Sequence, residues 1–179
     1  MDSAETRGRA RTFERIKNYS TDVPVDRTVA EIEKMLTKSA ASKILKDYDS
    51  AGNIFGLSFV INTVHGQMPV RMPVRIEKVI EVFKIQVSKG LLEKRYWEGD
   101  WARAQAARVG WRILRDWLDA QLALINVEMS SVPEIFLPYV YSAKLDKTVF
   151  DAFESGQLDR MLGEGNDDEH TLDSDRRRQ

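Results

Sequence analysis

The spacing of apolar residues first predicts a helix and then a run of strands. Four apolar residues at helical spacing, from Val29 to Leu36, predict an amphipathic helix over residues 27–38. Its start has the spacing of a capping box, Thr28 followed by Glu31, and Asp26 is an alternative cap. Three strand-like runs follow, and turn-forming residues separate them; the runs are residues 42–48, 54–62 and 67–72.

The second run has the clearest period of two in the chain. This alternation predicts that Phe55, Leu57, Phe59 and Ile61 share one face of the strand. The third run alternates in the same way but contains Pro69, which has no N–H to donate to a neighbouring strand. We therefore expect the third strand to lie at an edge of the sheet or to carry a bulge.

Helical periodicity returns after the third strand. It predicts a helix from Pro73 to Lys89 and a long helix over residues 101–129, which could be broken near Gly110. Residues 132–141 contain two prolines and predict an extended apolar segment, and residues 148–153 predict a short last helix. The fold class we expect is α+β, with a three-stranded antiparallel meander packed against helices in the order α-β-β-β-α and followed by the long helix.

Both ends of the chain differ from its middle. Residues 1–22 are polar and basic, and we expect a flexible arm with a short helix near residues 13–19. Residues 156–179 are acidic, and we expect a disordered tail. A single α+β domain is predicted between them, over residues 23–155.

The composition removes several kinds of chemistry. The 179 residues contain no cysteine, which excludes disulfides, thiolate catalysis and thiolate metal sites. No phosphate-binding glycine loop, zinc-protease motif or nucleophile elbow occurs. His65 lies in a turn without the sequence neighbours that a base or metal ligand needs. His170 follows Asp167, Asp168 and Glu169 in the acidic tail, but the alternating ligands and turn glycine of a hard-cation loop are missing. We therefore expect no catalytic residues, no metal and no cofactor.

Charge is separated along the chain although the net charge is only −1. The window from Arg71 to Arg115 holds eleven basic and five acidic residues, so the rest of the chain is acidic. The candidate nucleic-acid-binding residues in this window are Arg71, Arg75, Lys78, Lys94, Arg95, Arg108, Arg112 and Arg115.

Two groups of these cations have a suggestive position. Arg71 and Arg75 end the repeated tetrapeptide Met-Pro-Val-Arg, where a strand gives way to a helix whose N-terminus favours anions. Arg108, Arg112 and Arg115 share one face of the long helix, in its first half, where basic residues oppose the helix dipole. Phosphates, an acidic partner or acidic side chains of the same fold could compensate this arrangement.

Aromatic residues occur among the cations. Trp97 and Trp101 flank a short loop beside Lys94 and Arg95, so they are candidates for stacking on nucleic-acid bases. The alternative is that both indoles pack onto the protein body across the start of the long helix.

The order α-β-β-β-α over residues 27–89 resembles the double-stranded-RNA-binding domain, whose second helix begins with basic residues that contact phosphates. Arg75 and Lys78 occupy comparable places, although the lysine-rich motif of that family is not matched. The β-β-β-α core is similar in topology to phage single-strand annealing proteins. Residues 23–83 with residues 111–139 look like uncharacterised proteins of bacterial and phage genomes.

The resulting hypothesis is a non-enzymatic protein that contacts nucleic-acid phosphates through a basic patch. The alternative is a protein-interaction module, phage-borne and acting on a host or defence protein, that oligomerises through its long helix. A third reading is an enzyme whose site assembles only in space. The partners expected are therefore nucleic acid or an acidic protein surface, together with further copies of the chain. No secretory signal or membrane-spanning run occurs, so we expect a cytoplasmic protein without a membrane partner.

Overall fold

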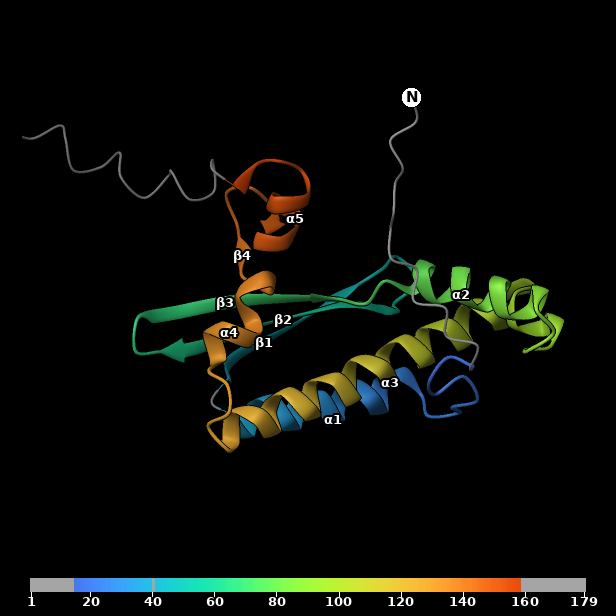
Figure 1. The fold of residues 1–179 in the computed structure, drawn as a ribbon, viewed down its shortest axis with the longest axis horizontal. Helices are drawn as coiled ribbons and strands as arrows, with labels where there is room; N and C mark the ends of the chain where they lie inside the picture. The colour runs from blue at the N-terminus through green and yellow to red at the C-terminus, as the bar shows by residue number, and fades with distance from the viewer. Residues whose placement is uncertain (1–14, 40, 159–179) are drawn as a thin grey trace, which may run out of the picture. The chain divides into compact units, whose positions relative to one another are not determined.

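The computed structural model describes residues 15–39 and 41–158 (Figure 1). These residues form two compact units. Among the described residues, unit 1 comprises residues 15–31 and Val74–Trp117, and unit 2 comprises residues 32–39, 41–73 and 118–158. Helices α1 (Val25–Lys38) and α3 (Gly99–Asn126) each contribute to both units. The predicted acidic tail from residue 159 and the first fourteen residues of the predicted arm lie outside the described residues.

Unit 2 contains the predicted three-stranded sheet. Strands β1 (Ala41–Tyr48), β2 (Ile54–Thr63) and β3 (Gly66–Pro73) are antiparallel and lie in the order β1-β2-β3. The α+β fold class is therefore confirmed, and β3 lies at an edge, as its proline requires. Its outer side is partly occupied, because Val140 forms an isolated bridge with Val70.

One face of the sheet forms the core of unit 2. Leu57, Phe59 and Ile61 are buried, as the alternation predicted, and the ring of Phe136 meets Phe59 edge-on with centroids 5.6 Å apart. The prediction for Phe55 was wrong, because this side chain is 49% exposed. The register shifts at the end of β1, where Tyr48 pairs with Ile54, so Phe55 is the extra residue of a bulge.

The segment after α3 is helical rather than extended. Helix α4 (Val132–Phe136) and the 3₁₀ turn η2 (Leu137–Tyr139) occupy it, which corrects the prediction for residues 132–141. Ser131 and Glu134 form a capping box, and a proline occupies the first turn, where its missing N–H costs nothing. A small hairpin of β4 (Tyr141–Ser142) and β5 (Lys147–Thr148) follows and leads into α5 (Val149–Glu154).

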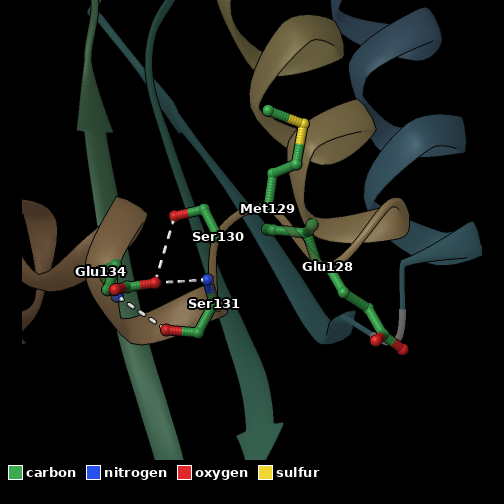
Figure 2. A pocket seen from close by; sticks show the side chains of 6 residues that line it. Glu128, Met129, Ser130, Ser131 and Glu134 are labelled. Carbon is green, nitrogen blue, oxygen red and sulfur yellow. Dashed lines mark hydrogen bonds between the residues drawn. The ribbon is translucent and has the colours of Figure 1, made fainter.

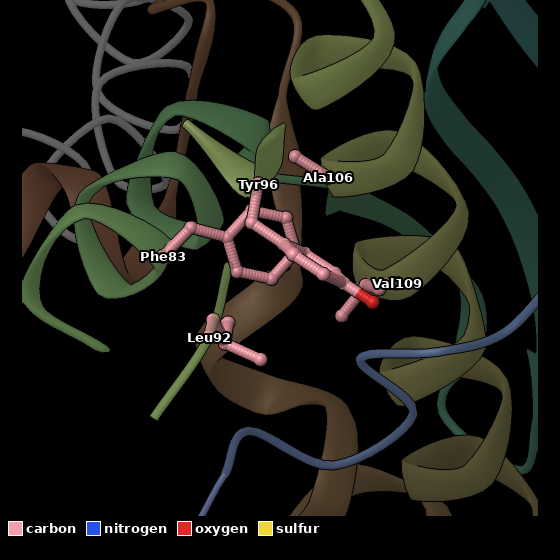
Figure 3. Packing of buried hydrophobic residues seen from close by; sticks show 5 residues of the cluster. All are labelled: Phe83, Leu92, Tyr96, Ala106 and Val109. Carbon is pink, nitrogen blue, oxygen red and sulfur yellow. The ribbon is translucent and has the colours of Figure 1, made fainter. Parts of the chain in front are cut away.

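Unit 1 is helical and has its own core. Helix α2 (Ile76–Ser88), the 3₁₀ turn η1 (Lys94–Tyr96) and the first part of α3 surround buried side chains (Figure 3). Phe83 and Tyr96 meet edge-on with centroids 5.4 Å apart. The residues of this cluster are Phe83, Leu92, Tyr96, Ala106 and Val109. Helix α3 continues through Gly110, beside which Val74 packs so closely that an added Cβ would lie 3.0 Å from a valine methyl carbon.

Residues 15–22, predicted within the arm, are held against unit 1. The buried side chain of Gln105 donates from Nε2 to the carbonyls of Tyr19 at 2.8 Å and Thr21 at 2.9 Å. The N–H of Ile16 donates to Gln86 at 3.1 Å. Buried amides therefore fix the path of this segment. Across the described part of the chain, no helix is long and apolar enough to cross a membrane.

Candidate nucleic-acid interface

Two of the predicted cations of α3 face a carboxylate of their own chain. Arg112 Nη1 lies 2.7 Å from Glu31 Oε2, and Arg115 Nε lies 3.3 Å from the same oxygen. The three side chains are 24%, 26% and 33% exposed. Partly buried ion pairs of this kind are screened less by salt than exposed ones. Arg112 and Arg115 therefore stabilise unit 1, and a ligand would have to displace Glu31 to bind them.

The third cation of this face is also committed. Arg108 donates from Nε at 2.9 Å and from Nη2 to Oε1 of Gln105, the amide that holds the 15–22 segment. Asp116 follows on the same helix and pairs with Lys17 at 2.8 Å. Carboxylate and amide side chains of the chain itself therefore provide partners for these arginines of α3, which oppose the helix dipole.

Arg71 is anchored within unit 2. Its Nη1 donates to Asp146 at 3.0 Å, and its guanidinium lies over the Tyr141 ring, 4.2 Å from the centroid. Burial works to lower the pKa of Arg71, but the hydrogen bond to Asp146 and the attraction of Tyr141 outweigh it and raise that pKa. Hydrogen bonds from Tyr141 and then Arg71 lower the pKa of Asp146. These three side chains join β3 to the β4–β5 hairpin.

The predicted anion site at the start of α2 is divided. Arg75 and Lys78 belong to unit 1, whereas Arg71 belongs to unit 2. Arg75 occupies the N-cap position of α2 and is exposed, and Lys78 pairs with Glu81 at 3.0 Å. Both members of that pair are more than half exposed, so the pair contributes little and can exchange for a phosphate.

Both candidate stacking residues are half-exposed and carry a cation. Trp97 is 43% exposed with Lys84 Nζ 4.5 Å from its ring centroid, and Trp101 is 41% exposed with the Arg95 guanidinium at 5.2 Å. Trp101 also meets the buried Tyr96 edge-on, with centroids 5.1 Å apart. The indoles are thus neither fully exposed nor fully packed away, and each presents apolar and cationic groups together.

We call this region the tryptophan–cation surface, and all of it lies in unit 1. Its members are Lys84, Lys94, Arg95, Trp97 and Trp101. Lys94 is exposed, and Arg95 pairs with Glu93 at 3.3 Å in an exposed contact. The sequence did not single out Lys84, because thirteen residues separate it from the indole it covers and no local spacing relates them.

The two units differ in charge. The described residues of unit 1 include thirteen basic and nine acidic side chains, and those of unit 2 include seven basic and nine acidic ones. Unit 1 therefore carries about four positive charges in excess and attracts anions, while unit 2 is slightly acidic.

Two carboxylates, Glu128 and Glu134, line an open hollow in unit 2. This hollow has a volume of about 500 Å³ and lies between the last turn of α3 and the start of α4, and the Glu134 carboxylate in it caps α4 (Figure 2). Hydrogen bonds from Ser131 and then Ser130 lower the pKa of Glu134. His65 is exposed in the β2–β3 turn, and His170 lies outside the described residues. The described residues also contain no group of three metal-ligating side chains.

Comparison with known proteins found no matching family model, curated protein or solved structure. The resemblances to RNA-binding domains, annealing proteins and phage-borne families therefore stay predictions.

Proposed function

We propose that the chain is a non-enzymatic nucleic-acid-binding protein that takes single strands on the tryptophan–cation surface of unit 1. The observation that carries this proposal is the pairing of two half-exposed indoles with cations, Lys84 on Trp97 and Arg95 on Trp101. Single strands are favoured over duplexes because an unpaired base offers its flat face to an indole, whereas a base in a duplex is already stacked.

Phosphate contacts supply the remaining affinity. Lys94 is exposed, and the pairs of Lys78 and Arg95 are exposed enough to exchange their carboxylate for a phosphate. Lys84, Lys94 and Arg95 of the tryptophan–cation surface can meet three phosphates, and Lys78 of the same unit adds a fourth cation that can exchange its partner. Each phosphate neutralised on a single strand contributes about −0.7 to the slope of log affinity against log salt, so the slope expected is about −2 to −3.

This proposal assigns different residues from those favoured by the sequence pattern. We assign Arg108, Arg112 and Arg115 a structural role instead of a ligand-binding one, because Arg108 is hydrogen-bonded to Gln105 and the other two are paired with Glu31. Because the proposed contacts are to phosphates and to base faces, binding is expected to depend on backbone charge and base stacking rather than on sequence.

The test is titration of the full chain with a labelled oligothymidylate at two salt concentrations. Trp97→Ala and Trp101→Ala should each weaken binding by about 5- to 150-fold, since stacking on one base contributes about 1–3 kcal/mol. Trp97→Phe keeps an aromatic face and should retain most of the affinity. Lys94→Glu should weaken binding and reduce the salt slope.

Lys144→Glu is the matched control for charge. Lys144 is exposed in the β4–β5 turn of unit 2, so this variant changes the net charge equally but leaves the proposed surface intact. If Lys94→Glu and Lys144→Glu weaken binding equally, or if both tryptophan variants bind as the parent does, the tryptophan–cation surface is not the site.

The alternative of oligomerisation through the long helix has less support. Trp111 is fully buried, Leu118 and Leu122 are buried, and Trp117 is half-buried, so these apolar residues of α3 are largely used within the chain. A free helix face of the kind that pairs two helices would need a continuous exposed apolar stripe.

A further inference from the structure

Strand β1 has an outer edge that no other strand of the described residues occupies. The sheet order is β1-β2-β3, so β1 is terminal, and the only isolated bridge found among the described residues is on β3. An edge strand presents unpaired N–H and C=O groups of every second residue, which can pair with a further strand. At eight residues β1 is longer than the average strand, and its Leu45 is 63% exposed.

The two faces of β1 are fixed by its pairing with β2. Ile44 pairs with the buried Phe59, so Ile44 and Lys46 face the core. Lys43, Leu45 and Asp47 alternate with them and lie on the outer face of the sheet. The carboxylate of Asp47 lies across Gly56, where an added Cβ would be 2.7 Å from a carboxylate oxygen, which agrees with this assignment.

We propose that β1 pairs antiparallel with β1 of a second copy, about a twofold axis at Leu45, so that the two sheets become one. The outer face of the strand is self-complementary in this register. Lys43 of each copy lies opposite Asp47 of the other, and the two exposed Leu45 side chains meet on the axis. The occupant that satisfies this charge pattern is therefore the same strand running in the opposite direction.

Neighbouring registers lack this complementarity. Residues opposite each other must share a face, so the pairing can move only in steps that keep the alternation. Centring the axis on Ile44 places Lys43 opposite Leu45, and centring it on Lys46 places two lysines opposite each other. Only the register centred on Leu45 brings opposite charges together twice.

Charge reversal tests the register. Lys43→Asp places two carboxylates opposite each other, and Asp47→Lys places two ammonium groups opposite each other. Because a cross-strand charge pair contributes a few tenths to one kcal/mol and occurs twice, each variant should weaken the dimer by about 10-fold or more. The double variant Lys43→Asp/Asp47→Lys should restore it, and the two single variants mixed together should form a heterodimer. Sedimentation equilibrium of nuclease-treated full chain measures each constant.

A cysteine placed on the axis gives a second readout that does not depend on affinity. The chain has no cysteine of its own, and residues directly opposite in an antiparallel pair have Cα atoms about 4.5–5.5 Å apart, within the range of a disulfide. Leu45→Cys should therefore cross-link efficiently under mild oxidation. The control is Val64→Cys, because Val64 is 96% exposed in the β2–β3 turn and away from the axis.

Restoration by the double variant, together with selective cross-linking at position 45, supports the pairing. A parent chain that stays monomeric at every concentration it tolerates overturns it, as does a dimer that ignores both charge reversals. Equal cross-linking at positions 45 and 64 also overturns it. None of these outcomes depends on nucleic-acid binding, which is placed in unit 1.

Discussion

Replacing Glu31 with Gln is the most informative single change, because it decides whether two arginines of α3 belong to the fold or to a ligand. The substitution keeps the shape of the side chain and removes the charge that Arg112 meets at 2.7 Å and Arg115 at 3.3 Å. A hydrogen bond to a charged group contributes about 1.5–3 kcal/mol net, and the second ion pair adds at most about 1 kcal/mol. Gln retains one acceptor oxygen, so we expect unfolding to become easier by about 1–3 kcal/mol.

Urea unfolding followed by circular dichroism at neutral pH measures this loss. For a chain of this size each kcal/mol corresponds to about 2–4 °C in Tm, so thermal unfolding gives an independent check. A double-mutant cycle with Arg112→Gln isolates the pairwise interaction, since both single changes and the double change are compared. The coupling energy should be about 1 kcal/mol or more.

Glu77→Gln is the matched control. Glu77 pairs with Arg103 at 2.9 Å, but both side chains are 66% exposed, so its loss should change stability by less than about 1 kcal/mol. If Glu31→Gln costs no more than this control and raises affinity for single strands, the reasoning fails. Arg112 and Arg115 would then be available to phosphates, as the sequence pattern first indicated.

Three further predictions concern the fold. Burial works to raise the pKa of Asp116, but the hydrogen bond from Lys17 and the other partners of this carboxylate lower its pKa below the usual value. The stability that Asp116 provides is therefore present above its pKa in the unfolded chain and is lost as pH falls through its pKa in the folded chain. Asp116→Asn should abolish this acid-side pH dependence, measured by unfolding in urea. Phe136→Ala should destabilise unit 2 by about 3–5 kcal/mol, measured by chemical unfolding, because Phe136 is fully buried against Phe59. Gln105→Leu should cost about 2–4 kcal/mol and increase hydrogen exchange near the two carbonyls it holds, whereas no change in exchange would contradict the anchoring role.

The periodicity of the sequence predicted regular helices and strands well, but it did not predict irregularities within them, such as a bulge or the proline in the first turn of α4. The strand and helix over residues 54–63 and 99–126 have long, regular patterns, and both were found. Phe55 departs from its predicted face because a bulge adds one residue to the strand, and a period-two rule has no place for it. Pro133 indicated an extended chain, but in the first turn of a helix proline is favourable.

The candidate site depended on contacts that no local pattern contains. The spacing of Arg108, Arg112 and Arg115 predicted a shared helix face, but it gave no sign of the carboxylate that meets Arg112, which comes from Glu31, eighty-one residues earlier. Charge counting along a chain cannot distinguish a cation facing solvent from one facing such a partner. For Trp97 and Trp101 the sequence left exposure and packing onto the body both open, and the structure shows an intermediate state in which both indoles are half-exposed.

The bridge between Val70 and Val140 bears on how far assembly of this chain could proceed. A sheet that grows by adding strands needs an open ladder at both ends, and the far edge at β3 is blocked where Val140 is hydrogen-bonded alongside it. In two copies joined at β1, the blocked β3 strands would form both outer edges of the combined sheet. Growth would end at a closed pair, so the chain could use an exposed strand for assembly without seeding fibres.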